Sequence, residues 1–331
     1  MKKLLIVALA LSFVPAFAKD EPAVKDAPAA KETPKEAPAA KPQEKEKPRR
    51  TPKPVARKPG QKAEFEAYDG GPWRPVDNRK GHLLGYQIKD AEMFGSAGRV
   101  FGKFARMLSD FPTEELDETI PDFHNMEFRL KQFNDAITEN KAGRLSDVKN
   151  LVDALLARSE KMCAAEQLHR DGRLPKRICH CDTKVNNMLF DADDNSFLCV
   201  IDLDTVMPSY IFSDYGDFLR TAANTAPEDE PDISKIHFRP EIFKAFTQGY
   251  LESAKSFLTD IEIENLPYAV ALFPYMQCVR FLTDYLNGDT YYKILYPEHN
   301  KVRSYAQYEL FSQVEAAQEE LSEVIKNLVN H

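Results

Sequence analysis

Apart from a turn and short strand expected at 69–74, short runs typical of β-strands fall in one stretch of this chain, residues 177–201, with apolar residues at helical spacing on both sides. The strand-like runs are 177–179, 188–190 and 197–201, and the polar residues 191–196 predict a turn between the last two. A chain of many helices around so small a hairpin-rich core is expected to adopt an α+β fold.

The helices on either side are predicted from apolar periodicity and from helix-ending residues. Phe94, Phe101 and Leu108 recur at helical spacing before Pro112, and Ser146 is the expected N-cap of a long helix that Gly172 stops. The expected helices span about residues 91–111, 125–139, 146–170, 214–225, 240–257, 260–286 with a kink at Pro274, and 303–329.

The first 18 residues have the pattern of a secretory signal peptide. Lys2 and Lys3 precede the apolar residues 4–14, which are too few to span a bilayer, and Ala16-Phe17-Ala18 is a small-x-small cleavage site. We therefore expect export to the periplasm or the medium, whereas a mis-assigned gene start would leave the protein in the cytoplasm. No later segment of the sequence reads as transmembrane.

Residues 19–62 are rich in Ala, Pro, Lys and Glu and contain nine prolines. Such a segment cannot bury enough apolar surface to offset the entropy of ordering, so we expect a disordered spacer before a folded domain at 63–331. Charge follows the same division. Residues 1–62 carry 15 Lys and Arg against 7 Asp and Glu, whereas the whole chain carries 44 against 52, which leaves about −16 on 63–331. A domain this acidic is a poor partner for nucleic acid.

The cysteines do not form a disulfide framework. Their number is odd and their spacing is irregular, which is typical of a reducing compartment and conflicts mildly with an export signal. A zinc site at His180 with its neighbouring cysteines is an alternative, although a fourth ligand is not obvious. The five are Cys163, Cys179, Cys181, Cys199 and Cys278.

The most specific chemical pattern lies in residues 179–189 and shortly after them. His180 is followed by Asp182, Asn187 comes five residues after that Asp, and Asp202 ends an apolar run. In kinase-like phosphotransferases, this order supplies an Asp that accepts the proton of the attacking hydroxyl, then an Asn and an Asp that hold the metal on the phosphates. The expected strands place all three on loops, where catalytic side chains are often presented.

The segment 180–187 resembles the catalytic loop of the aminoglycoside phosphotransferase superfamily, which is kinase-like. Four further segments, 120–124, 201–208, 215–217 and 280–289, are similar to its N-acetylhexosamine 1-kinase branch, and the resemblance covers roughly residues 68–330. It implies phosphorylation of the anomeric hydroxyl of N-acetylglucosamine or N-acetylgalactosamine, with ATP as co-substrate and Mg²⁺ as the metal.

The resemblance also implies roles for single residues. Asp182 would be the catalytic base, and Lys184 would stabilise the charge of the transferring phosphoryl group. Asn187 and Asp202 would bind Mg²⁺ through oxygen atoms. The candidates for the sugar are Asp122, His124, Asp204, Asp217, Arg280 and Asp284, of which Asp204 could instead join the metal site.

Structural interpretations of several residues stay open beside these roles. Asp182 could be an ordinary turn residue, and we expect His180 to brace the loop rather than to transfer protons. Asp217 and Arg220 could form an ion pair at the start of a helix.

Two other structural interpretations concern the C-terminal part. Arg280 and Asp284 lie one helical turn apart and could form a surface pair that contributes little. Tyr291 and Tyr292 are expected in the core.

The resemblance starts at about Tyr68, near the end of the small lobe that holds ATP in kinase-like enzymes. Gly70-Gly71 reads as a turn rather than as a glycine-rich loop, and Lys80 and Lys89 lack the surroundings of the lid lysine. The expected fold is therefore the mostly helical C-terminal lobe of a protein-kinase-like fold, with a truncated small N-lobe after a disordered spacer. A separate chain could supply the missing lobe.

Two functions follow from the sequence. The first is an ATP-dependent phosphotransferase acting on a small-molecule sugar, with activity impaired if the lid is missing, since water would then reach the phosphates. The alternative is an exported non-catalytic module, similar to a pseudokinase, that keeps a sugar pocket or an interaction surface.

Overall fold

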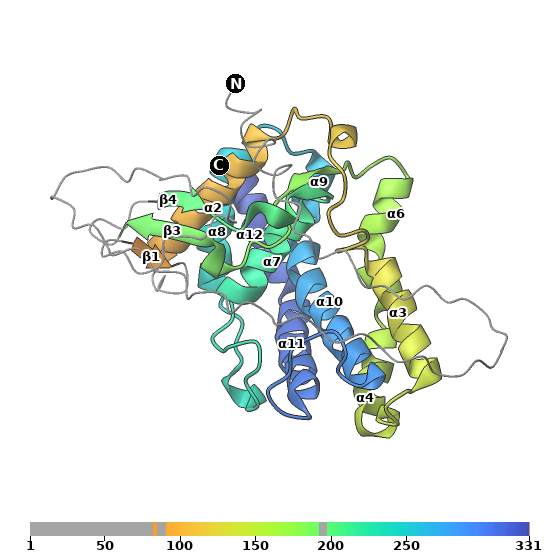
Figure 1. The fold of residues 1–331 in the computed structure, drawn as a ribbon. Coiled ribbons are helices and arrows are strands. Elements are labelled where there is room, and N and C mark those ends of the chain that lie inside the picture. Colours follow the sequence, from red (N-terminus) through yellow and green to blue (C-terminus); the bar gives the residue numbers. More distant parts are fainter. Residues whose placement is uncertain (1–81, 85–90, 192–196, 331) are drawn as a thin grey trace, which may run out of the picture. The chain divides into compact units, whose positions relative to one another are not determined.

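The computed structural model describes residues 82–84, 91–191 and 197–330, which form a mostly helical α+β unit (Figure 1). This confirms the predicted fold class. The predicted signal peptide at 1–18 and spacer at 19–62 lie outside the described residues, as do Lys80 and Lys89. In the ranges that the structure describes, no helix is both long enough and apolar enough to cross a membrane.

The strands form two small antiparallel sheets. One sheet has the order β1-β3-β4, and the other pairs β2 with β5. The strand bounds are β1 (His82–Leu84), β2 (Arg177–Cys179), β3 (Met188–Asp191), β4 (Phe197–Val200) and β5 (Met207–Ser209). The sequence predicted β2, β3 and β4 but not β5. Its middle residue is Pro208, which pairs with Ile178 and has no N–H for the ladder, so the segment carries no strand signal.

β2, which leads into the segment 180–187, is anchored at its first residue. The Arg177 guanidinium donates through Nε to Glu262 Oε1 at 2.5 Å and through Nη2 to Glu262 Oε2 at 2.7 Å. Glu262 also completes a capping box with Thr259 at the start of α9 (Asp260–Glu264). One buried carboxylate therefore fixes both a helix start and the strand before the predicted catalytic loop.

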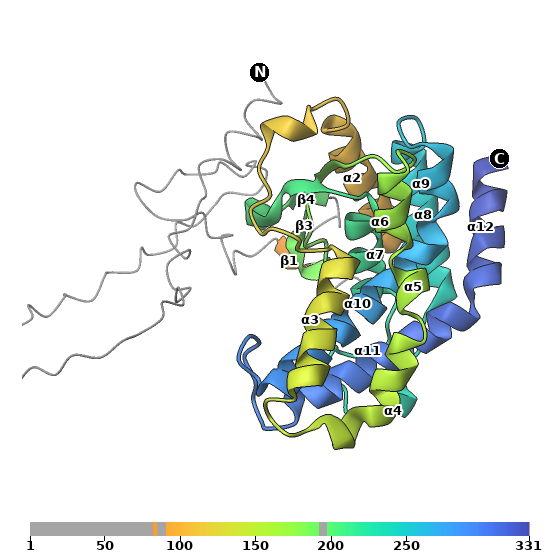
Figure 2. The same ribbon diagram turned by 90° about the vertical axis from the view of Figure 1, so that its right-hand side faces the viewer.

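Helices α2 (Ala91–Met107) and α8 (Pro240–Ala254) pack with their backbones nearly in contact, and Figure 2 shows them side by side. A Cβ atom on Gly98 would lie 2.1 Å from the carbonyl oxygen of Phe246, and one on Gly249 would lie 1.9 Å from that of Gly95. Both distances are far inside van der Waals contact. Glycine is required at these two positions because any side chain would separate the helices.

Helix α10 (Leu266–Asn287) runs through the helical layer and is buried along most of its length (Figure 1). It contacts α3 (Met126–Glu139), α7 (Phe212–Ala222), α11 (His299–Ala316) and α12 (Gln318–Asn330). Pro274 lies inside it without ending it, as predicted. The single helix expected at 260–286 is in fact α9 and α10. Pro267 explains the break, because it lacks an N–H and disfavours helical backbone before it.

The long helix predicted at 146–170 is also divided, into α4 (Leu145–Leu156), α5 (Ser159–Met162) and α6 (Ala164–Arg170). Ser146 is not its N-cap, since α4 begins at Leu145, whose N–H donates to the side-chain oxygen of Asn140. At the break, Arg158 donates to the carbonyl of Ala154 and pairs with Glu315 of α11. A contact that is distant in sequence thus turns the chain, which local periodicity cannot show. The predicted helix 303–329 is likewise α11 and α12.

Glu166 of α6 is an acid buried against the start of α3. It is 5% exposed, its Oε1 accepts from the Met126 N–H at 2.6 Å, and its Oε2 has no partner among the described residues. Burial raises the pKa of Glu166 from 4.5 to about 7. The folded chain therefore binds a proton there more tightly than the unfolded chain does.

We predict that this carboxyl makes stability fall as the pH rises. Its contribution is complete below pH 4.5 and is lost as the pH passes about 7, a change of about 3 kcal/mol at most. Urea unfolding at pH 5 and pH 8 should show a smaller loss of stability for Glu166→Gln than for the parent chain. Glu160→Gln, at an exposed position of α5, is the control. Equal pH dependence in the parent chain and Glu166→Gln would contradict the prediction.

Candidate active site

Residues at the start of α7 hold the segment 180–187 by hydrogen bonds. The Asp214 carboxylate accepts from the His180 N–H at 2.9 Å and from the Cys181 N–H at 2.8 Å. Thr183 donates through its hydroxyl to the Asp214 carbonyl at 2.6 Å. Asp214 is 2% exposed, and burial raises its pKa. These bonds hold the turn at Cys181, which has a left-handed φ of 63° that non-glycine residues rarely adopt.

His180 is fully buried and braces the loop from inside. Its Nε2 lies 2.9 Å from the Ile201 carbonyl and its Nδ1 accepts from the Asp182 N–H at 3.2 Å, so the proton is assigned to Nε2. The rings of Phe101 and Phe104 pack edge-on against it. The prediction that His180 braces the loop is confirmed.

The structure brings together three of the predicted site residues. Asp182 Oδ2 accepts from Lys184 Nζ at 2.7 Å and from Asn187 Nδ2 at 3.0 Å. Asn187 Nδ2 also donates to the Asp182 carbonyl at 2.7 Å. Burial lowers the pKa of Lys184, but the adjacent Asp182 carboxylate outweighs it, so the pKa is raised overall. Asp182 is thereby fixed in one orientation by two donors.

Asp202 and Asp204 lie just after β4, where the chain turns into the 3₁₀ helix η4 (Leu203–Thr205). Asp202 has a left-handed φ of 65°. Burial, then the carboxylates of Asp204 and Asp182, raise the pKa of Asp202. Crowding of like charges at a strand end is relieved by a cation.

A divalent cation that prefers oxygen ligands fits Asn187 and Asp202, whereas the zinc site considered at His180 and the cysteines is not formed in the described residues. Asn187 uses its Nδ2 on Asp182, so its Oδ1 is left for a ligand, and Asp202 adds a carboxylate. Mg²⁺ prefers such oxygen ligands and often takes only one or two from the protein, with phosphate oxygens completing its shell. In the part of the chain that the structure describes, no three His, Cys, Asp or Glu side chains converge as a metal site, and all five cysteines are free.

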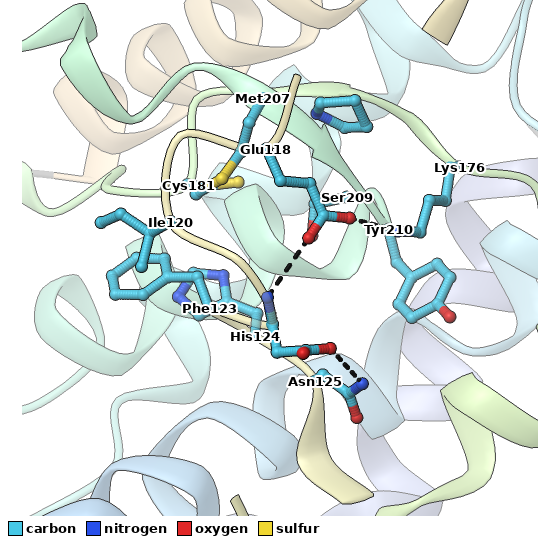
Figure 3. Close-up of a pocket in the computed structure, with 12 residues that line it drawn as sticks. Glu118, Ile120, Phe123, His124, Asn125, Lys176, Cys181, Met207, Ser209 and Tyr210 are labelled. Atoms are coloured by element: carbon cyan, nitrogen blue, oxygen red, sulfur yellow. Dashed lines mark hydrogen bonds and ion pairs between the residues drawn. The ribbon is translucent and has the colours of Figure 1, made fainter. Parts of the chain in front are cut away.

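Asp122 and His124 lie on the loop before α3, in a pocket that Figure 3 shows. Asp122 Oδ1 accepts from Asn125 Nδ2 at 2.7 Å, and the His124 ring stacks on Phe123 with centroids 4.4 Å apart. The pocket has a volume of about 50 Å³ and also contains the Cys181 side chain. This volume holds a few water molecules and not a sugar ring.

Asp217 forms the ion pair considered from the sequence. Its Oδ1 lies 3.0 Å from the Arg220 guanidinium, and both side chains are nearly buried. Burial raises the pKa of Asp217, which Arg220 opposes and Asp182 reinforces. Asp217 is therefore an ion-paired acid that lies close enough to Asp182 for that carboxylate to raise its pKa.

Arg280 and Asp284 do not form a surface pair, so that interpretation is wrong. Asp284 is 4% exposed, and its two oxygens accept from the backbone N–H groups of residues 290, 291 and 292 and from Asn300. It anchors the loop after α10. Tyr291 on that loop is 70% exposed, which contradicts its expected place in the core, because the anchored backbone turns its ring outward.

Three residues that support the segment 180–187 were not predicted from the sequence: Asp214, Thr183 and Thr205. Thr205 donates through its hydroxyl to the His180 carbonyl at 2.8 Å. Asp214 does stand at the predicted start of a helix, where an acid is usually explained by the helix dipole. Its neighbours Phe212, Tyr215 and Phe218 are apolar, and an acid inside so apolar a helix start was the available signal.

We predict that Asp214→Asn destabilises the protein by about 2 kcal/mol, because an amide N–H would face a backbone N–H that now has an acceptor. Urea unfolding measures the change. Asp135→Asn, which breaks an exposed pair with Lys131, should change stability by less than about 0.5 kcal/mol. If the two variants are equally stable, Asp214 does not have this role.

The chain is similar to solved structures of two kinases. The chain is similar to Plasmodium vivax ethanolamine kinase, with 17% identity and a TM-score of 0.46 over 69% of this chain and 62% of that one. It is also similar to choline kinase from Cryptosporidium parvum Iowa II, with 12% identity and a TM-score of 0.40 over 76% of this chain and 70% of that one. The chain thus spans less than two thirds of the ethanolamine kinase.

A family model gives the stronger result. The model described as the phosphotransferase enzyme family matches residues 17–255. The match includes the loop 180–187 and the segment 201–208, whose residues carried the resemblance. Because it covers well over half of the 331 residues, the chain belongs to the phosphotransferase enzyme family.

Proposed function

We propose that this protein transfers a phosphoryl group from ATP to a sugar hydroxyl, in the manner of an N-acetylhexosamine 1-kinase. Family membership implies a kinase-like reaction with ATP, a divalent metal and a small-molecule acceptor. The observation that carries the proposal is the Asp182 carboxylate, which two donors hold beside the oxygen ligands Asn187 and Asp202.

Two features of Asp182 support its proposed role as the base. Its side chain is 24% exposed, so a hydroxyl can reach it, while Lys184 and Asn187 fix its direction. The base would accept the hydroxyl proton as the oxygen attacks the terminal phosphorus of ATP. In phosphoryl transfer the protein contributes mainly position and charge, and this carboxylate has both.

Lys184 and the metal ion that Asn187 and Asp202 would hold supply the opposite charge. Lys184 Nζ lies 2.7 Å from the base and is 41% exposed, so it can also contact a phosphate oxygen. Asn187 and Asp202 would hold Mg²⁺, which when bound neutralises charge on the phosphates. Asp204, the second residue of η4, is available to the metal or to the sugar.

The residues proposed to contact the sugar are Asp217, His124 and Asp122. Asp217 is electrostatically coupled to Asp182, and Arg220, its ion-pair partner, acts on His124. Polar side chains of this kind give directional hydrogen bonds to sugar hydroxyls. Asp284, whose oxygens already accept from the protein, would act by holding the loop 288–298 beside the sugar.

We predict that Asp182→Asn lowers the turnover number at least about 100-fold, because the amide cannot accept the proton. Binding of N-acetylhexosamine, measured by calorimetry, should change less than about threefold, since the shape is kept. ATP-dependent phosphorylation of N-acetylglucosamine and N-acetylgalactosamine is the assay, with Asp135→Asn as control. Equal turnover in the parent chain and Asp182→Asn would refute the proposal. Binding of ATP and sugar without transfer in the parent chain would favour the non-catalytic alternative.

We predict that Asp202→Asn raises the Mg²⁺ concentration needed for half-maximal activity at least about tenfold, because a charged ligand becomes neutral. Chelation of divalent ions should abolish activity in the parent chain. Asp204→Asn is the informative companion variant. An equal rise in it would assign Asp204 to the metal, and a rise in the Michaelis constant for sugar alone would assign it to the acceptor. No change in Mg²⁺ dependence for Asp202→Asn would contradict its role.

A further inference from the structure

Two arginines from different helices meet at Phe123. Arg129 of α3 donates through Nε and Nη2 to the Phe123 carbonyl at 3.2 and 2.8 Å. The guanidinium carbon of Arg280, on α10, lies 5.0 Å from the centre of the Phe123 ring. We call Arg129 and Arg280 the arginine pair.

The arginine pair has no carboxylate partner in the described ranges. Besides Phe123, Arg129 donates to Gln132 Oε1 at 2.9 Å, and Arg280 donates to Gln277 Oε1 at 3.1 Å. Both acceptors are neutral. The neighbouring Arg220, by contrast, forms ion pairs with Asp217 and Glu228. Two guanidinium groups that contact the same residue, one at its ring and one at its carbonyl, are thus left without an ion-pair partner among the described residues.

The two guanidinium groups of the arginine pair repel each other electrostatically. Burial, and then repulsion from Arg280, lower the pKa of Arg129 to about 10. The nearby Asp122 carboxylate acts in the opposite sense, but its effect is smaller than that of Arg280. A second anion close to the pair would therefore be stabilised.

His124 adds an unused polar atom at the same place. Its Nδ1 is buried and has no hydrogen-bond partner among the described residues. Burial, followed by Arg280, Arg129 and Arg220, lowers its pKa well below 6.5, so the ring is neutral at physiological pH. A neutral imidazole beside two cations can donate to or accept from a ligand without adding charge.

Aromatic rings form a wall beside the pair. The Arg280 guanidinium carbon lies 5.7 Å from the Tyr292 ring centre, and the exposed Tyr291 ring meets Tyr292 edge-on at 4.8 Å. Asp284 holds the backbone of both tyrosines, so the wall is fixed in place. The Arg280 guanidinium stacks on these rings and donates through Nη1 to Gln277, so its other N–H groups are left to bind a carboxylate or phosphate. Arg129 adds positive charge, since its Nε and Nη2 already donate to the Phe123 carbonyl.

We propose that the arginine pair binds an anionic substituent of the sugar acceptor, a carboxylate or a phosphate, so that the acceptor is a negatively charged hexosamine. This inference rests on the proposed function, whose substrate class it narrows. The arginine pair lies near the proposed base, because Phe123, which both arginines contact, lines the same pocket as Cys181, the residue before Asp182.

Calorimetry without ATP tests this inference separately from catalysis. The probes are N-acetylglucosamine, its C6 uronic acid and its 6-phosphate, which differ only at C6: a neutral hydroxymethyl group, a carboxylate or a phosphate ester. We expect at least one charged sugar to bind the parent chain about tenfold more tightly than the neutral one, the gain of a charge-assisted contact. The uronate and phosphate arms distinguish the two kinds of anion. Equal binding of all three sugars, or no binding of the charged ones, would overturn the inference whether or not transfer occurs.

Substitutions test whether the arginine pair causes the preference for the charged sugar. Arg280→Gln and Arg129→Gln should each reduce the preference for the charged sugar over the neutral one to less than about threefold. Arg280→Lys, which keeps the charge, should restore most of it. Arg106→Gln removes the same charge from an exposed position of α2 and should have no effect. Thermal unfolding confirms that each variant is folded, and an undiminished preference in both glutamine variants would refute the assignment.

Discussion

The carboxylate of Asp214 is the contact on which the candidate active site depends. A buried acid that accepts two consecutive backbone N–H groups replaces the hydrogen bonds a strand would have made, so the chain can leave β2 and turn at Cys181. Asp182 then projects outward while His180 remains inside. Because Asp214 belongs to α7, the position of Asp182 depends on the packing of that helix against α10 as well as on the loop itself.

Much of the fold could be predicted because long, periodic apolar segments form helices whatever their neighbours are. The helix at about 125–139 was predicted for this reason, and the structure has it as α3. The breaks at Arg158 and Asn265 depend instead on a distant glutamate and on a proline near a helix start, and they interrupt the apolar period very little. β5 was invisible because a three-residue strand with a central proline has no pattern of its own.

The same distinction holds within the site. Asp182, Lys184 and Asn187 lie within six residues of one another, so their spacing in sequence already implies their meeting in space. The support from Asp214 and Thr205 comes from residues more than twenty positions away and could only be seen in three dimensions. Arg280 illustrates the limit most clearly, because its helical neighbour Asp284 suggested a pair, whereas its real contacts are the rings of Phe123 and Tyr292.

The glycine contact between α2 and α8 has a consequence for how this sequence can change over generations. Gly98 and Gly249 each face a carbonyl oxygen of the other helix at about 2 Å from where a Cβ would stand. A substitution at either one forces the helices apart, and no change of side chain on the opposite helix can compensate, since the obstacle is backbone. Substitutions at these two positions are therefore not tolerated, whereas residues on the solvent-facing sides of the same helices are free to vary.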